Sequence, residues 1–201
     1  DPAGPFLAAV LNPAYPLVVV THNEGQSQTR NPFEQVLIEP ILESLANLYG
    51  LDAQEGMGVV VPHRAQRAAL QQLLARIKPA SEADEFPVAA AVDTVERFQG
   101  GEREVILVSA TESDKDYLLQ AGEFLYDPRR LTVAISRAKR KMILVAAQSI
   151  FTLFSPEESA FANSQIWKNL LRHTCTVPLW QGEIEGQRVE VWGNQPVEPP
   201  A

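Results

Sequence analysis

Cysteine is nearly absent from this sequence, which contains only Cys175 among its 201 residues. A single thiol cannot form an intramolecular disulfide, and zinc sites built from cysteine pairs are excluded as well. We therefore expect a protein of a reducing compartment, whose fold depends on its own core. A chain of this length buries roughly 70% of its unfolded surface, so it needs no covalent cross-link.

Long apolar runs and a targeting signal are lacking too. No stretch reaches the roughly eighteen consecutive apolar residues of a membrane span, so we expect no membrane partner. The chain begins with DPAGPF, without a methionine or a basic segment. We therefore expect no signal peptide, but a piece of a longer protein that is intracellular and cytoplasmic.

Positive charge is scarce, since 17 lysines and arginines face 25 acidic residues and give a net charge of −8. This balance argues against a domain that grips nucleic acid by bulk charge, although a local basic groove is compatible with it. Residues 127–141 are the exception, because six cations and one aspartate give them a formal charge of +5. Arg130 and Arg137 lie seven residues apart, so two helical turns would place both on one face. Such concentrated positive charge predicts an anionic ligand.

Short apolar runs alternate with amphipathic segments along most of the chain. Runs typical of strands buried on both faces occupy residues 17–21, 57–61, 88–92, 104–110 and 141–146. Helices are expected over residues 31–48, over 64–77 and in the arginine-rich segment after residue 127. Strands alternating with helices predict an α/β domain with a mostly parallel sheet flanked by helices.

The remaining segments suggest three parts. Residues 1–16 hold four prolines and are expected to form an extended lead-in or linker. Residues 17–154 would be the main domain, with a polar loop at 112–126. Residues 155–201 would be a C-terminal extension packed on it, with a helix at 163–173 and a strand pair at 177–192.

The start of the helix over 31–48 has clear signals. Asn31 is a plausible N-cap, Pro32 occupies the first helical position, and Glu34 is placed as a capping-box glutamate. Pro40 lies inside the helix and predicts a kink or a break.

Three polar segments would lie beside the sheet, namely PHRAQR at 62–67, DTVERFQGGE at 93–102 and the route into the arginine-rich helix. Ligands of parallel sheets bind beyond the carboxyl ends of the strands. We therefore expect the three segments to converge at one edge of the domain.

Three stretches in this order resemble helicase motifs. GVVVPHRAQRAAL resembles motif IV, VDTVERFQGGEREVILVS resembles motif V, and DPRRLTVAISRAKRKMILV resembles motif VI of superfamily 1 helicases. The sequences of these motifs are most similar to those of the 1B branch, which includes the nonsense-mediated-decay helicase. In addition, NPFE at 31–34 fits the helix start that precedes motif IV. The resemblance covers residues 17–154 and implies a RecA-like three-layer domain.

In this family ATP and Mg²⁺ lie between two RecA-like lobes, and the first lobe supplies the phosphate loop and the magnesium carboxylates. This chain contains no G-x-x-x-x-G-K-[ST] sequence. The resemblance therefore implies a second lobe that hydrolyses no ATP by itself. Its expected partners are the N-terminal lobe of the same chain and single-stranded DNA or RNA.

The resemblance also implies roles for single residues. Arg137 matches the motif VI arginine that acts as a finger on the γ-phosphate, and Arg67 matches the motif IV arginine, a second γ-phosphate contact. An arginine suits both positions because it stays charged and can bond two oxygens at once.

Further nucleotide contacts are expected in motif V and beside motif VI. Glu102 matches the glutamate that accepts ribose hydroxyls, Gly100 permits a tight turn near the nucleotide, and Gln99 couples the ATP cleft to the strand. Arg130 is expected to support motif VI at the nucleotide.

Two contacts to the strand are expected. Thr94 matches the hydroxyl residue that bonds a phosphate of the bound nucleic acid. Such a contact positions the nucleic acid but does not recognise its sequence. His63 would contact or stack on the strand. No metal site is expected, because Asp114 and Asp116 lack a ligand set with suitable spacing.

Two other classes of protein are alternatives to a helicase lobe. A RecA-like domain without catalysis could serve as a scaffold that binds nucleic acid or protein. It would have no need for Arg67, Glu102 and Arg137 together. A nuclease would require clustered carboxylates with a lysine at a sheet edge, and the sequence offers no convincing set.

Overall fold

The protein is described by a computed structural model that covers residues 4–78, 87–94, 97–98, 101–121 and 127–196. Gln99 and Gly100 lie outside these residues, as does the side chain of Arg130. The described residues form a seven-stranded sheet in the order β3-β2-β4-β5-β1-β7-β6. Its strands are β1 (Leu17–His22), β2 (Met57–Val61), β3 (Val92–Thr94), β4 (Arg103–Ser109), β5 (Ala138–Ala147), β6 (Val177–Ile184) and β7 (Gln187–Gly193).

Strand pairing confirms the predicted α/β class. Strands β3, β2, β4, β5 and β1 pair in parallel, while β7 pairs antiparallel with both β1 and β6. The helices are α1 (Pro5–Val10), α2 (Pro32–Asn47), α3 (Arg64–Leu74), α4 (Lys115–Ala121), α5 (Pro128–Ser136), α6 (Gln148–Thr152) and α7 (Glu158–Asn169). A 3₁₀ turn at Val88–Ala91 and a π-helical turn at Leu170–Thr174 complete the described elements.

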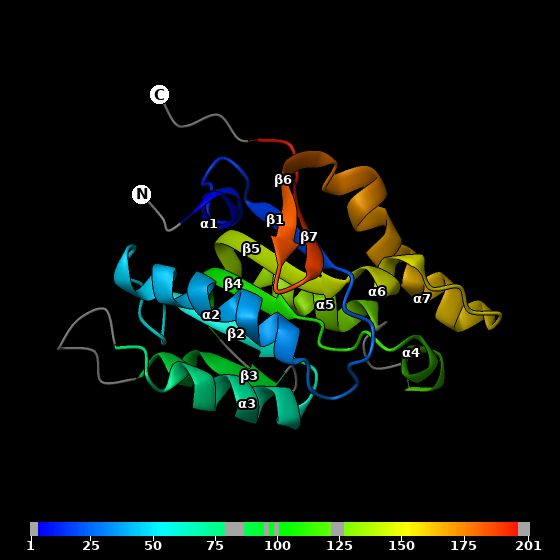
Figure 1. Cartoon of the computed structure of the whole chain (residues 1–201), viewed down its shortest axis with the longest axis horizontal. Coiled ribbons are helices and arrows are strands. Elements are labelled where there is room, and N and C mark those ends of the chain that lie inside the picture. The colour runs from blue at the N-terminus through cyan, green and yellow to red at the C-terminus, as the bar shows by residue number, and fades with distance from the viewer. Residues whose placement is uncertain (1–3, 79–86, 95–96, 99–100, 122–126, 197–201) are drawn as a thin grey trace.

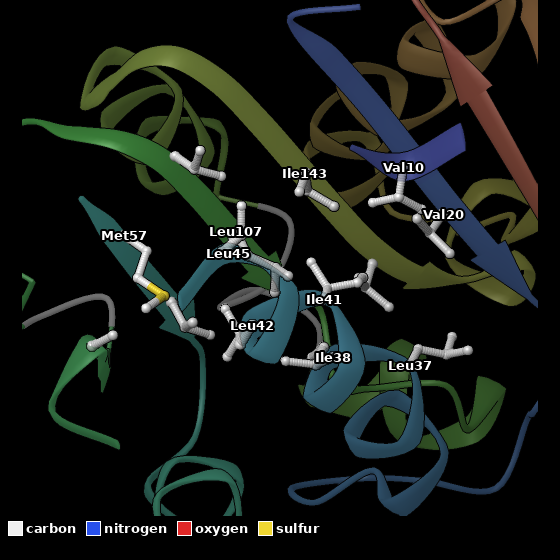
Figure 2. Packing of buried hydrophobic residues seen from close by; sticks show 14 of the residues in the cluster. Val10, Val20, Leu37, Ile38, Ile41, Leu42, Leu45, Met57, Leu107 and Ile143 are labelled. Atoms are coloured by element: carbon white, nitrogen blue, oxygen red, sulfur yellow. The ribbon is translucent and has the colours of Figure 1, made fainter. Parts of the chain in front are cut away.

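Helices cover both faces of the sheet, which makes the fold three-layered (Figure 1). Helices α1, α2 and α3 pack on one face of the sheet and form the first layer with it. Helices α4, α5, α6 and α7 pack on the other face and form the second layer. Figure 2 shows α2 in the first layer, where Leu45 and Ile41 lie near the sheet residues Leu107 and Ile143. Because neighbouring strand residues point to opposite faces, strands this apolar must be covered on both.

The N-terminal segment differs from the expected extended lead-in. Residues Pro5–Val10 form α1, with Leu7 and Val10 buried in the first layer. Pro5 suits the first turn of a helix, where its missing N–H costs nothing. The loop after α1 is tied to β5, because Lys141 Nζ donates to the carbonyl oxygens of Asn12 and Tyr15 at 2.9 and 2.6 Å.

The predicted C-terminal strand pair is present and continues the central sheet. Strand β7 pairs with β1 along its length, and its residues Val189 and Val191 are fully buried in the first layer. The turn to β7 contains Glu185 and Gly186, both with positive φ, as a two-residue hairpin turn requires. The division of the chain at residue 154 remains a prediction.

Two local predictions were wrong, and a third was wrong in part. The run at 88–92 starts as a 3₁₀ turn, so β3 spans only Val92–Thr94. The expected loop at 112–126 contains α4, whose Leu118 is buried in the second layer. Helix α2 continues through Pro40, which excludes the break that was one of the two expected outcomes, while the kink stays a prediction.

Candidate functional site

Arg67 lies one turn into α3 and is paired with the edge strand. Helix α3 begins where β2 ends, and Arg67 Nε lies 3.2 Å from Asp93 Oδ1 on β3. The same aspartate oxygen accepts a hydrogen bond from the backbone N–H of Thr94 at 2.8 Å. Arg67 is therefore held beside the carboxyl end of β3, with 28% of its side chain exposed.

Arg137 lies at the opposite edge of the sheet. It is the C-cap of α5, and its carbonyl oxygen accepts a hydrogen bond from the N–H of Arg103 at 2.9 Å. Arg103 and Ala138 are partners at the amino ends of β4 and β5. Glu102 precedes Arg103 directly, so Glu102 and Arg137 share this amino edge.

The expectation that all three polar segments converge at the carboxyl ends was therefore wrong for Arg137. Helix α5 precedes its strand without an intervening loop, so the end of the helix meets the amino end of β5. Helices α3 and α5 also lie on opposite faces of the sheet. The structure brings Arg137 together with Glu102, but it gives neither of them a contact with Arg67 among the described residues.

Motif V runs between the two edges. Its Phe98 ring lies 5.4 Å from Arg103 Cζ and packs over Gly58 of β2, where an added Cβ would come within 2.5 Å of Phe98 Cζ. Gly101 has φ 116°, a conformation that favours glycine. Asp93, Arg97, Phe98 and Arg103 help to line a small cavity of about 90 Å³ at this edge strand.

Three arginines from the three motifs share an unusual feature. The Nε atoms of Arg67, Arg103 and Arg137 are buried and make no hydrogen bond within the described part of the chain. For Arg67 the neighbouring Asp93 oxygen is an ion-pair partner whose position does not suit a hydrogen bond. Buried donors are normally bonded, so these guanidiniums are suited to accept an anionic ligand.

Glu102 is accessible at the same edge as Arg137. Its side chain is 62% exposed, and its carboxylate lies 3.9 Å from Lys139 Nζ, a loose surface ion pair. An exposed carboxylate with a weak ion-pair partner can accept hydrogen bonds from the hydroxyl groups of a ligand.

The two residues predicted to contact nucleic acid, Thr94 and His63, lie at the carboxyl ends of the β-strands. Thr94 is buried at the end of β3, with 5% exposure. His63 is the N-cap of α3 without a capping hydrogen bond, and its Nε2 lies 2.6 Å from Oε1 of the buried Glu112. His63 is also in edge-to-face contact with Tyr117 of α4.

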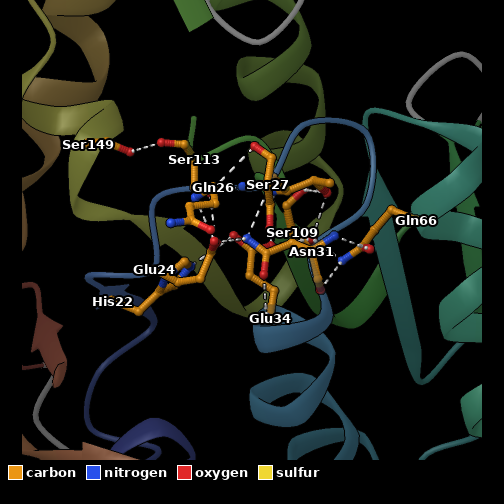
Figure 3. A network of polar contacts seen from close by, with 11 residues as sticks. His22, Glu24, Gln26, Ser27, Asn31, Glu34, Gln66, Ser109, Ser113 and Ser149 are labelled. Atoms are coloured by element: carbon orange, nitrogen blue, oxygen red, sulfur yellow. Dashed lines mark hydrogen bonds and ion pairs between the residues drawn. The ribbon is translucent and has the colours of Figure 1, made fainter. Parts of the chain in front are cut away.

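A buried polar network fills the space beside this edge (Figure 3). Asn31 caps α2 as predicted, since its Oδ1 accepts from Glu34 N at 2.9 Å. The reciprocal capping-box bond is absent, because Asn31 N donates to Gln66 Oε1 and the Glu34 carboxylate points elsewhere. Glu34 is fully buried and bonds His22 Nε2 at 3.1 Å and Thr111 N at 2.9 Å.

The network extends from α2 to the loops after β1 and β4. Ser113 Oγ accepts from Ser27 N and donates to the Glu24 carboxylate, and Ser149 Oγ donates to the Ser113 carbonyl. This network was not predicted, because Glu34 was expected to act as a capping-box glutamate. The available signal was SATES at 109–113, a polar run directly after an apolar strand.

Comparison with known proteins decides the family. A family model described as an AAA domain matches residues 11–149. The DNA replication ATP-dependent helicase/nuclease JHS1 of Arabidopsis thaliana is 30% identical over 151 residues, which cover 72% of this chain and 10% of the relative. The corresponding DNA2 protein of Mus musculus is 32% identical over 162 residues, covering 78% of this chain and 14% of the relative. This chain belongs to the superfamily 1 helicases.

A third superfamily 1 relative supports the branch that motifs IV, V and VI suggested. The ATP-dependent helicase NAM7 of Saccharomyces cerevisiae is 29% identical over 119 residues, covering 59% of this chain and 11% of the relative. The helicase domain described here is thus of the nonsense-decay and DNA2 type, with the RecA-like fold of that family. It spans between 10% and 14% of the length of these three relatives.

Within the described residues, no three histidine, cysteine or acidic side chains gather as metal ligands would. None of the described helices is long and apolar enough to span a membrane.

Proposed function

We propose that this chain is the C-terminal RecA-like lobe of an ATP-dependent DNA or RNA helicase. The three relatives described above are ATP-dependent helicases or helicase/nucleases. Because the sequence contains no phosphate loop, ATP and Mg²⁺ would be held mainly by an N-terminal lobe of the parent protein. The present lobe would complete the ATP site from the other side of the nucleotide. It would hydrolyse no ATP by itself. The parent protein would act inside the cell, where nucleic acid and ATP are present.

The observation that carries this proposal is the guanidinium of Arg137, whose buried Nε has no hydrogen-bond partner among the described residues. In phosphoryl transfer, negative charge spreads over the γ-phosphate oxygens, and an arginine finger is worth about 10³–10⁵ in rate in the GTPase cases. Arg137 would take this role. Glu102, exposed at the same edge, would accept the ribose hydroxyls, with Gln99, Gly100 and Arg130 as further contacts.

Arg67 would bind the γ-phosphate as a second cation. Its present ion pair with Asp93 joins two partly exposed side chains, so the pair is weak enough to exchange. Closure of the two lobes would bring the nucleotide held by the N-terminal lobe against Arg137. Thr94 and His63, at the carboxyl edge, would contact a single strand of DNA or RNA.

Replacing Arg137 tests the nucleotide role. In the two-lobe parent protein, Arg137→Ala should lower strand-stimulated ATP turnover by about a thousandfold or more while nucleotide binding changes little. Steady-state ATPase assays and binding of a fluorescent ATP analogue measure the two effects. Arg140→Ala is the matched control, because Arg140 is 82% exposed and already paired with Glu104.

The outcomes separate the helicase lobe from its alternative. Wild-type turnover by Arg137→Ala would overturn the finger assignment. A wild-type two-lobe protein without ATPase activity would instead favour a non-catalytic RecA-like binding module.

A further inference from the structure

Thr111 has a strained backbone at a buried position. Its φ is 66°, a left-handed conformation that is unusual for a β-branched residue. Such strain persists only where the surroundings hold the residue in place, and it concentrates at functional sites. The feature lies outside motifs IV, V and VI, so the motif-based roles do not explain it.

The buried network holds Thr111 from three sides. Its N–H donates to Glu34 Oε2 at 2.9 Å, its carbonyl oxygen accepts from Asn31 Nδ2 at 3.0 Å, and its hydroxyl lies 2.9 Å from Ser109 Oγ. All four residues are nearly or fully buried. The network therefore fixes the direction in which the chain leaves β4, and with it the position of the next residue, Glu112.

Glu112 is aimed at His63. Its side chain is fully buried, Oε1 lies 2.6 Å from His63 Nε2, and Oε2 has no hydrogen-bond partner among the described residues. A buried carboxylate is costly unless it is paired, so the contact with His63 should be strongly maintained. The bond fixes the plane of the imidazole ring.

Tyr117 completes an aromatic pair with His63. The ring centroids lie 6.4 Å apart at an interplanar angle of 64°, and His63 keeps 20% of its side chain exposed while Tyr117 is half-buried. Burial, and then the charge of Glu112, raise the pKa of Tyr117, so its hydroxyl stays neutral at working pH. Exposed cations lie close in sequence to both rings, namely Arg64 and Lys115.

We propose that His63 and Tyr117 form a stacking surface for an unpaired base of the bound strand, and that Glu112 positions it. The inference rests on the proposed function and adds Tyr117 and Glu112 to it. A base fits this place better than a phosphate does, because the neighbouring carboxylate of Glu112 repels an anion. Stacking on aromatic side chains is tolerant of sequence, which suits a protein that moves along a strand.

Binding of an oligonucleotide tests the stacking surface. The probe is a fluorescein-labelled oligo(dT) of about twelve nucleotides, a length comparable to the site sizes of OB-fold single-strand-binding domains. Tyr117→Leu should weaken binding by about 5- to 150-fold, the loss expected for one stacked base. Tyr117→Phe, which keeps a ring, should bind like the wild type. Tyr49→Leu is the matched control, because Tyr49 is 50% exposed at the end of α2, away from this edge.

The positioning role of Glu112 has its own test. Glu112→Gln keeps an acceptor oxygen for His63 and should retain most of the affinity, whereas Glu112→Ala should lose as much as Tyr117→Leu. A purely structural role would instead lower the melting temperature of both variants without separating their affinities.

A measurement on the unaltered chain keeps the proposal testable if a variant fails to fold. The ring resonances of His63 and Tyr117 should shift in the NMR spectrum when oligo(dT) is added. Binding without such shifts, or equal binding by wild type and Tyr117→Leu, would overturn the stacking surface alone. Absence of any binding, in this chain and in the two-lobe protein, would overturn the proposed strand contact itself.

Discussion

Lys141 is a buried charged residue of β5, and it is only 7% exposed. Burial lowers its pKa from 10.5 to about 8. Its ammonium group donates to two carbonyl oxygens in the loop after α1. This lysine anchors the N-terminal segment, which explains how the loop can stay fixed without secondary structure.

The depressed pKa predicts a pH dependence of stability. Between pH 8 and pH 10.5 the unfolded chain holds a proton on Lys141 that the folded chain has released, so its contribution to stability rises with pH. For Lys141 alone the free energy of unfolding should rise by about 2 kcal/mol from about pH 8 to about pH 10.

Urea unfolding of wild type and Lys141→Met at both pH values measures this contribution. The difference in unfolding free energy between the two proteins should change with pH, because methionine does not titrate. Parallel curves for the two proteins would contradict the assignment.

At the level of single residues, the sequence motifs name candidate site residues but do not predict how they are arranged. Arg67, Glu102 and Arg137 stand in recognisable motifs, but periodicity does not tell which edge of the sheet a helix end reaches. The roles of Glu34 and Glu112 were missed because burial of a carboxylate depends on partners distant in the chain, such as His22 and His63.

Helix α2 provides a prediction at the scale of an element. Pro40 lies inside this continuous helix and lacks the N–H that would bond the preceding turn. Pro40→Ala should therefore raise the free energy of unfolding by about 1–3 kcal/mol and the melting temperature by about 2–4 °C per kcal/mol.

Pro32→Ala is the matched control for that measurement. Pro32 occupies the first position of the same helix, where proline is tolerated, so its replacement should give no such gain. Thermal unfolding followed by circular dichroism compares the two variants. An equal response of both would show that the interior position carries no special cost.

The elements that the sequence predicted best are apolar strands such as β2 and β5, because a short run of consecutive apolar residues is typical of a strand buried on both faces. The less predictable ones are short. Strand β3 has three residues and α4 has seven, too few for a period to emerge, and α4 is fixed mainly by the burial of Leu118.

The whole molecule offers a test of the predicted domain division. A chain that ends after Phe154 lacks α7, β6 and β7, and therefore lacks Val189 and Val191 from the core. It should lose cooperative unfolding and associate, because β1 would become an edge strand and apolar core residues that pack on the hairpin would be exposed. Circular dichroism and size-exclusion chromatography measure both effects.

A chain that ends after Pro196 is the control for this truncation. It keeps the bonds between Asn194 and Leu17 and should unfold like the full chain. Cooperative unfolding of the shorter chain near the wild-type temperature would instead support a self-sufficient domain over residues 17–154.

The hairpin of β6 and β7 also decides what the sheet presents to other molecules. Without it, β1 would be an edge strand whose Val18, Val19 and Val20 invite pairing with a second copy. With it, the outermost strands are β3, which is only three residues long, and β6, which contains Pro178 and alternates between exposed and half-buried residues. Short or proline-containing borders discourage edge-to-edge aggregation. The hairpin therefore protects the sheet against self-association, and the proposed pairing with an N-terminal lobe would depend on that protection.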